Sequence, residues 1–467
     1  MRIGVGAARD PGRGTGVTFV IQALTTETWL SMLQDGRQAE RLVTGWTWDD
    51  AHTTATLTLR DDVYFHDGSR LTPQIAAQAL RPSLITGQLP SASSIKSVSA
   101  FGDHTIKVEL TEPNSFLLPD MSLASLTLPT NARIGTGPFQ IDSQTSGQTI
   151  LKAFPKYYRG APGLSRIDVN LYPTQRNAWA ALMRGEVDML HEVSRDAAEF
   201  VSAETTVNSF SFPRPYYIPL VFNMRHPVLS RPEVRIAINE ALDRAAIVRD
   251  AMRGHGSPAD GPMWPQHWAY TPGAGGFTFD PKGVRSRLDA AGLTLKPNRD
   301  GTPKRFSFSC LMWADDTRFD RLAIMVQKQL ADVGIDMKIV PLPQTEFIPR
   351  LGSGEFDAFI FEMAGRSLSW MYLFWRSGQG LNGSGYTAAD HVLDRIRAAR
   401  SEGEIKAASA ELSRILRQDP PAAFLAWQET SRAVSTGFDV AAEKNRDIFT
   451  GIWQWRRAPD ARKLPTP

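Results

Sequence analysis

Cysteine is almost absent from this sequence. Its 467 residues include one cysteine, Cys310, so the chain can form neither an internal disulfide nor a cysteine-rich zinc site. Cys310 lies in an apolar run, FSFSCLMW at 306–313. We expect it to be a small buried side chain rather than a nucleophile.

Long apolar runs are also missing. No stretch approaches the roughly 18 consecutive apolar residues of a membrane-spanning helix. The N-terminus, MRIGVGAARDPGRG, lacks the apolar core of a signal peptide. We therefore expect either a cytosolic protein or a chain from which an export signal has been removed.

The sequence also lacks an excess of either positive or negative charge. The chain has 52 Lys and Arg against 49 Asp and Glu, which gives a net charge of +3. We find no block of Lys and Arg, so we predict no nucleic-acid partner. The length predicts two to four domains, at roughly 100–200 residues for each.

The familiar catalytic patterns are absent too. Gly4-Val5-Gly6 follows a strand-like segment, but Arg9 stands where a dinucleotide site needs its third glycine. There is no phosphate loop and no Gly-x-Ser-x-Gly elbow. None of the eight histidines pairs with another four residues on. We predict no catalytic residue, no metal site and no cofactor.

The periodicity of the chain predicts two kinds of structure. Alternation at 54–66 and a hairpin at 95–110 indicate antiparallel sheet between about 40 and 130. Later segments alternate between strand and helix: Thr174 can cap a helix, 231–253 has the strongest helical pattern in the chain, and 305–363 has the pattern of a βαβαβ run. We expect two further helices near 387–400 and 402–417.

Two strand candidates, 217–223 and 422–428, bracket the second α/β block. The chain would enter this block through the first and leave it through the second. Two crossings between α/β lobes form a hinge, and a hinge creates a cleft for a ligand.

Several segments resemble one known family. Residues 48–72, WDDAHTTATLTLRDDVYFHDGSRLT, resemble the most recognisable segment of the oligopeptide/dipeptide-type solute-binding proteins of ABC importers, solute-binding protein family 5. Further similar segments follow in the family's order: GTGPFQI at 135–141, the stretches 154–190 and 216–248, QLADVGIDMKIV, RLGSGEFDAFIF and LNGSGY at 381–386. The similarity covers about 40–430.

The resemblance implies a fold and a division of the chain. The fold would be α/β, two-lobed and periplasmic-binding-protein-like (class II), with an extra antiparallel subdomain inserted in the first lobe. Lobe I would comprise 1–218 and 427–467, with the extra subdomain at about 36–132. Lobe II, the βαβ lobe that closes over the ligand, would comprise 219–426.

One departure from the family bears on the ligand. Peptide-binding members place Trp and Asp just after the third strand of the second lobe, where the Asp receives the peptide ammonium. Here Met363 stands at the Trp position, Ser369 lies near the Asp position, and Arg366 adds a positive charge. Glu362 could substitute for the Asp, or could instead pair with Arg366. We expect an oligosaccharide or an acidic, modified peptide rather than an ordinary free-amine peptide.

The expected ligand contacts come from both lobes. Strand ends and the loops beyond them are where open α/β sheets bind ligands, and tryptophan faces suit sugars and peptides. The alternative for each residue is a purely structural role. The chosen residues are Thr25, Thr26, Trp29, Thr136, Trp313, Glu362, Arg366, Trp370, Trp375 and Asn382.

The predicted function is the substrate-binding component of an ABC transporter. It would capture a peptide, modified peptide or oligosaccharide, without catalysis, and deliver it to the permease subunits. We expect a monomer in the periplasm or anchored to the cell envelope. The alternatives are a cytosolic ligand-sensing domain of the same fold and a glycan hydrolase that uses paired carboxylates.

Overall fold

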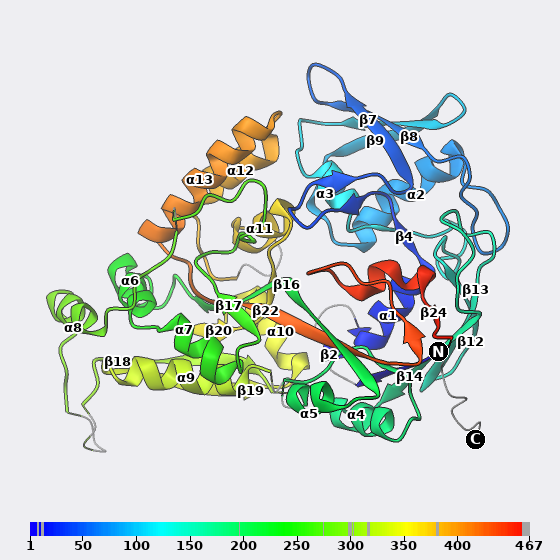
Figure 1. Ribbon diagram of the computed structural model, residues 1–467. Helices are drawn as coiled ribbons and strands as arrows, with labels where there is room; N and C mark the ends of the chain where they lie inside the picture. The colour runs from blue at the N-terminus through cyan, green and yellow to red at the C-terminus, as the bar shows by residue number, and fades with distance from the viewer. Residues whose placement is uncertain are drawn as a thin grey trace. The chain divides into compact units, whose positions relative to one another are not determined.

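The chain forms two compact units (Figure 1). The computed structural model describes residues 1–459 apart from 7–8, 11–13, 196, 274, 298–300, 302, 315–317 and 380–382. Unit 1 comprises 1–34, 38–213 and 429–467, and unit 2 comprises 35–37 and 214–428.

The observed unit boundaries differ from the predicted ones by a few residues. The chain passes from unit 1 to unit 2 after Pro213 and returns after Gln428, against predicted boundaries after 218 and 426. The segment Asp35–Arg37 groups with unit 2, although the prediction assigned it to lobe I. The backbone explains this grouping, because the Trp268 amide donates to the Asp35 carbonyl at 2.9 Å.

The main sheet of unit 1 runs in the order β12-β13-β14-β1-β15 and continues to the last part of β22. Strand β1 pairs in parallel with β14 and β15, and its alternate residues Ile3 and Val5 are buried. The bounds are β1 Arg2–Gly6, β12 Phe139–Gln144, β13 Gln148–Ala153, β14 Arg166–Tyr172, β15 Met189–Leu190 and β22 Ala422–Ser435.

Three helices accompany this sheet: α1 (Gly16–Thr25), α4 (Gln175–Met183) and α5 (Ala198–Ala203). Helix α4 packs on β1, and α1 packs on β12. The predicted cap of α4 is confirmed, since the Thr174 hydroxyl accepts from the Asn177 amide at 3.1 Å.

Unit 1 also contains a four-stranded antiparallel sheet in the order β7-β8-β10-β9. Its strands are β7 Val43–Trp48, β8 Thr54–Leu59, β9 Ile95–Phe101 and β10 Thr105–Leu110. The hairpin expected at 95–110 is present. The strand expected at 54–66 ends at Leu59, because the Arg60 amide bonds to the Leu42 carbonyl and the chain leaves the sheet.

Short elements complete unit 1. They are β2 Arg9–Asp10, β3 Gly14–Thr15, β4 Glu27–Thr28, β5 Ser31–Met32, β6 Gln38–Ala39, α2 Pro73–Thr86, η1 Pro90–Ser94, α3 Leu117–Met121, β11 Ser125–Leu126, β23 Phe438–Asp439, η3 Ile448–Gln454 and β24 Arg456–Arg457.

The sheet of unit 2 runs in the order β22-β16-β20-β18-β19. Strand β18 (Phe306–Trp313) pairs in parallel with β19 (Ile335–Leu342) and β20 (Ala358–Ile360), while β16 (Val207–Phe222) pairs antiparallel with β20. Helices α9 (Asp320–Ala331) and α10 (Gln344–Ser353) connect the parallel strands. The predicted βαβαβ run is therefore present.

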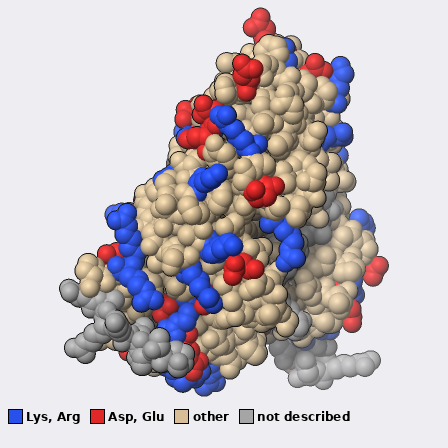
Figure 2. Space-filling view, turned by 90° about the vertical axis from the view of Figure 1, so that its right-hand side faces the viewer, with Lys and Arg blue, Asp and Glu red and all other residues tan. Residues whose placement is uncertain are grey.

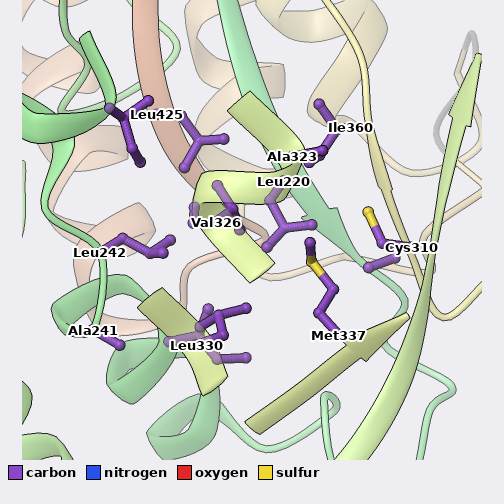
Figure 3. Close-up of a cluster of buried hydrophobic side chains, with 14 of the residues drawn as sticks. Leu220, Ala241, Leu242, Cys310, Ala323, Val326, Leu330, Met337, Ile360 and Leu425 are labelled. Carbon is purple, nitrogen blue, oxygen red and sulfur yellow. The ribbon is translucent and has the colours of Figure 1, made fainter. Parts of the chain in front are cut away.

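Apolar side chains from these elements form the core of unit 2 (Figure 3). Leu220 of β16, Val326 of α9 and Met337 of β19 are among its fully buried members. Cys310 is also fully buried there, as expected, and burial raises the pKa of its thiol. The other elements of unit 2 are α6 Pro232–Glu240, α7 Arg244–Ala246, η2 Ile247–Ala251, β17 Gly256–Pro258, α8 Pro281–Ala290, β21 Met363–Ala364, α11 Leu368–Trp375, α12 Asp390–Ala398 and α13 Glu402–Gln418.

The single helix expected over 231–253 is wrong. The segment forms α6, α7 and the π-turn η2 in succession. The Asp243 side chain accepts from the Ala246 amide at 2.9 Å and so begins a new helix after α6 has ended. The break directs the Arg244 guanidinium to the Phe424 carbonyl at 2.6 Å, which ties this segment to β22.

Charges of both signs are interspersed over the face in Figure 2, as the near-balanced composition leads us to expect. Within the residues that the structure describes, no helix is both long and apolar enough to cross a bilayer.

Candidate functional site

A buried glutamate with two arginines lies in unit 2. Glu362 follows the end of β20, and only 5% of its side chain is exposed. Its Oε2 accepts from Gln428 Nε2 at 2.7 Å, from Arg214 Nη1 at 3.3 Å and from Arg318 Nη1 at 3.3 Å. One carboxylate thus faces two guanidinium groups and one amide. We call these four residues the Glu362 cluster.

The arginines decide the charge state of Glu362. Burial alone would raise its pKa, but the positive charges of Arg214 and Arg318 outweigh burial and lower the pKa to about 2. Glu362 is therefore ionised at neutral pH. It acts as an acceptor only and has no proton to offer as a general acid.

Four separate segments bring the cluster together. Arg214 and Gln428 are the first and last residues of unit 2 in β16 and β22, where the chain passes between units. Strand β21 pairs with β16 through Tyr217 and Met363, and this register sets Glu362 beside the start of the unit. Arg318 precedes α9, in the connection that follows β18.

Aromatic side chains adjoin the cluster in sequence and in space. The Trp427 ring packs edge to face with the rings of Tyr217 and Trp264, with ring centroids 5.1 Å and 5.0 Å apart. The Trp375 indole donates to the Tyr217 hydroxyl at 2.9 Å. Arg214 lies over the Tyr216 ring, 4.1 Å from its centroid. These contacts join β16 to β22 and to α11.

The structure places the residues predicted in unit 1 as follows. Thr25 is the last residue of α1 rather than part of a loop, and its hydroxyl donates to the Ile21 carbonyl at 2.8 Å. Thr26 donates to the Gln22 carbonyl at 2.8 Å. Trp29 is fully buried and donates to the Ser83 hydroxyl at 2.9 Å. The apolar residues of 16–25 explain the helix, since Val20 and Leu24 share its buried face.

Thr136 and Trp313 share one property. Both are buried, and neither the Thr136 hydroxyl nor the Trp313 indole nitrogen has a hydrogen-bond partner within the described residues. Buried donors of this kind are costly unless an acceptor reaches them. Each would gain an acceptor if a ligand supplied one.

The other residues predicted in unit 2 lie beyond β20. Arg366 is half-buried after β21, and Trp370 of α11 stacks on Phe374 at 5.5 Å. Trp375 is buried at the end of α11. The ion pairs given for Glu362 are with Arg214 and Arg318, and its pairing with Arg366 stays a prediction. Asn382 lies outside the described residues.

Sequence reasoning missed Arg214, Arg318 and Gln428. They lie 148, 44 and 66 residues from Glu362 in the chain, so no local spacing connects them. The available signal was positional, since two of them stand close to the predicted crossings. The described residues contain no cluster of three or more His, Cys, Asp or Glu that could hold a metal ion.

Comparisons with known proteins agree on one family. Residues 38–385 match the family described as bacterial extracellular solute-binding proteins, family 5 Middle. The probable D,D-dipeptide-binding periplasmic protein DdpA of Escherichia coli K12 is 25% identical over 339 residues, which are 68% of this chain and 64% of that protein. The oligopeptide-binding protein AppA of Bacillus subtilis 168 is 25% identical over 438 residues, 85% of this chain and 79% of that protein.

The fold also matches solved structures. NikZ of Campylobacter jejuni, solved with Ni(L-His), superposes with a TM-score of 0.84 at 20% identity, and the match covers 98% of this chain and 99% of that one. This match confirms the predicted α/β fold of the periplasmic-binding-protein type. The family match spans most of the sequence and confirms the predicted resemblance, so the chain belongs to the bacterial extracellular solute-binding proteins of family 5.

Proposed function

We propose that this protein is the substrate-binding component of an ABC importer. It binds a solute without chemical change and delivers it to the permease subunits. One observation carries the proposal: the family match extends over residues 38–385, most of both units. The names of DdpA and AppA, a dipeptide-binding and an oligopeptide-binding protein, support a solute of peptide size.

The proposed place of action is the periplasm or the outer face of the cell envelope. The periplasmic naming of DdpA supports it. We propose further that the protein acts as a monomer and binds no nucleic acid. The balanced charge, +3 over 467 residues, favours the second point.

The proposed contacts remain those predicted from the sequence, with the Glu362 cluster added. Thr136 and Trp313 are supported by their buried donors, which have no acceptor within the described residues. Thr25, Thr26, Trp29 and Trp375 already hydrogen-bond within the protein, which favours a supporting role for them.

The test combines native mass spectrometry of the purified chain with calorimetry. We expect one small molecule for each chain in the native spectrum, and its loss after mild denaturation and refolding. Adding the identified molecule back should give stoichiometric heat and no product. Turnover of that molecule, or the absence of any bound or binding solute, would contradict the proposed function.

A further inference from the structure

A pocket opens at the surface of unit 2 between α6, α13 and the segment before α8. Its volume is about 370 Å³. Ile236 and Phe277 give it an apolar lining, and the nearby Phe279 is 46% exposed. Two arginines of α13, Arg414 and Arg417, line it as well. A pocket of this size with a mixed lining is suited to a small molecule.

The two arginines of this pocket are neighbours on α13. They lie three residues apart, so their side chains project from the same face of the helix. Neither the Arg414 nor the Arg417 guanidinium forms an ion pair or a hydrogen bond within the residues that the structure describes. The nearest acids in the sequence, Glu411 and Asp419, pair with other arginines. Like charges on one helix face repel each other, and a bound anion would relieve this repulsion.

A third charged residue, Glu240, lines the same pocket. Its carboxylate accepts two hydrogen bonds from Arg287, Oε2 from Nε at 3.0 Å and Oε1 from Nη2 at 3.3 Å. Glu240 is thus already paired, and the guanidinium groups of α13 stay available to a ligand. The negative charge of Glu240 nevertheless disfavours a doubly charged ligand such as a phosphate monoester. The pocket therefore favours a singly charged oxyanion, a carboxylate.

The pocket lies away from the edge of the sheet at which the proposed solute contacts gather. Phe222, at the end of β16, donates its amide to the Pro421 carbonyl at 3.0 Å and pairs with Ala358, the first residue of β20. The chain between α13 and β22 therefore lies at the amino ends of the parallel strands. Trp313 and Glu362, which belong to the proposed solute site, lie at the carboxyl ends, where open α/β sheets bind ligands.

We propose that this pocket is a second ligand site, which binds a small carboxylic acid with an apolar ring. Arg414 and Arg417 bind the carboxylate, since guanidinium groups form parallel hydrogen bonds with such oxyanions. The ring packs on Ile236 and Phe277. The site is independent of the proposed transport function, because none of its lining residues belongs to the Glu362 cluster or to the predicted solute contacts.

The experiment compares matched acids and amides with the full chain. The acids are benzoate, phenylacetate and naphthoate, and each is compared with its primary amide. Phenyl phosphate supplies a second oxyanion on the same ring, and at about pH 7.5 it carries close to two negative charges. Calorimetry measures the affinities. We expect the best acid to bind with a dissociation constant of about 1 mM or tighter, and its amide to bind at least roughly fivefold more weakly.

Variants then locate the contact. Arg414→Gln and Arg417→Gln should each weaken binding of the acid, and the double variant should bind the acid no better than wild type binds the amide. Lys406→Gln is the matched control, because Lys406 is an exposed cation of α13 that does not line the pocket. It should bind as wild type does. All three side chains are exposed, so we expect the variants to fold, which circular dichroism checks.

Several outcomes would overturn the second site. They are the absence of binding by every acid, equal affinity for each acid and its amide, undiminished affinity in the double variant, and a loss in Lys406→Gln as large as that in Arg414→Gln. Tighter binding of phenyl phosphate than of benzoate would overturn the assignment to a carboxylate. None of these results bears on the proposed solute-binding function, which the native mass spectrum tests separately.

Discussion

Among the described residues each unit buries one glutamate, and the two differ in the partners of the carboxylate. In unit 1, Glu27 is 1% exposed, pairs with Arg41 and accepts from the Tyr157 hydroxyl at 2.5 Å. In unit 2, Glu362 faces two arginines and an amide. One carboxylate therefore has one cation, and the other has two.

The two carboxylates differ in how their donors are arranged. A one-to-one pair with a neutral donor satisfies the charge and the oxygens of Glu27 within unit 1. Burial and the nearby Glu27 charge raise the pKa of Tyr157, so the tyrosine stays a donor at neutral pH. Glu362 instead receives both arginines and the Gln428 amide on a single oxygen, Oε2.

Removal of the charge of Glu362 should have the largest effect. Glu362→Gln leaves two guanidinium groups without their anion, and breaking a buried pair costs about 3–5 kcal/mol. We expect this loss in the free energy of unfolding, measured by urea denaturation at pH 7. A loss below about 1 kcal/mol would contradict the assignment of Glu362 as the anchor of both arginines.

The pH dependence gives a second test of the same variant. The pKa of Glu362 lies at about 2 in the folded chain, below its ordinary value of 4.5. A carboxyl with a lowered pKa stabilises the fold above its ordinary pKa, and this stability is lost as pH falls from 4.5 towards 2. The difference in the free energy of unfolding between wild type and Glu362→Gln should therefore become smaller as the pH falls over that interval.

Protonation of His267, also in unit 2, should produce the next largest loss in the free energy of unfolding, and this loss should occur at higher pH than that of Glu362. Burial lowers the pKa of His267 from 6.5 to about 4, although Asp35 opposes the shift. Its Nδ1 accepts from the Ala269 amide at 3.1 Å, which requires an unprotonated nitrogen. As pH falls from 6.5 to 4 the unfolded chain takes up the proton first, so stability should fall by up to about 3 kcal/mol.

His267→Asn is the matched variant, because its side-chain oxygen can still accept from the Ala269 amide. The free energy of unfolding of this variant should not show the loss due to His267 between pH 6.5 and 4. It should still show the loss due to Glu362 as the pH falls from 4.5 towards 2. If the free energy of unfolding falls with pH equally steeply in wild type and His267→Asn above pH 4.5, His267 is not the source of that pH dependence.

The sequence allowed much of this fold to be predicted, for physical reasons that apply locally. A strand or helix that buries one face repeats its apolar residues at a fixed period, as Leu322, Val326 and Leu330 do in α9. Caps are local too, which is why Thr174 predicts the start of α4. The two crossing segments followed from the order of such elements, within five residues of the observed boundaries.

What could not be predicted depends on contacts between distant residues. The break at Asp243 is a local bond, but an unbroken helix satisfies the same periodicity, and the Arg244 contact with Phe424 decides against it. The spacing of tryptophans in the sequence does not distinguish a ligand contact from a core position, so the sequence could not decide whether Trp29 and Trp375 contact a ligand or pack in the core. Arg214 and Arg318 become neighbours only after β16 and β18 join one sheet.

Loss of the neutral donor in unit 1 should cost less than loss of the charge in unit 2. Tyr157→Phe removes one hydrogen bond to Glu27 and leaves the Arg41 pair intact. Hydrogen bonds to charged groups contribute about 1.5–3 kcal/mol, which is the expected loss in urea denaturation. Tyr158→Phe is the matched control, because the Tyr158 hydroxyl lies near the Glu27 charge but makes no hydrogen bond within the described residues, and its ring centroid lies 5.0 Å from that of Tyr157 and 4.7 Å from the Arg60 guanidinium. Equal losses in the two variants would show that the hydroxyl of Tyr157 carries no special weight.

The smallest effect should come from a charge removed at the surface of α9, the helix that follows Arg318. Lys328 lies four residues before Asp332, with Nζ and Oδ2 3.2 Å apart and both side chains more than half exposed. Exposed pairs at this spacing contribute about 0.3–0.5 kcal/mol because water and salt screen them, so Lys328→Gln should change the free energy of unfolding by no more than that. Solute binding, measured by calorimetry, should not change. A loss above about 1 kcal/mol would contradict the screening of this exposed pair. The larger loss expected for Glu362→Gln would then no longer follow from burial, since an exposed ion pair would contribute as much as a buried one.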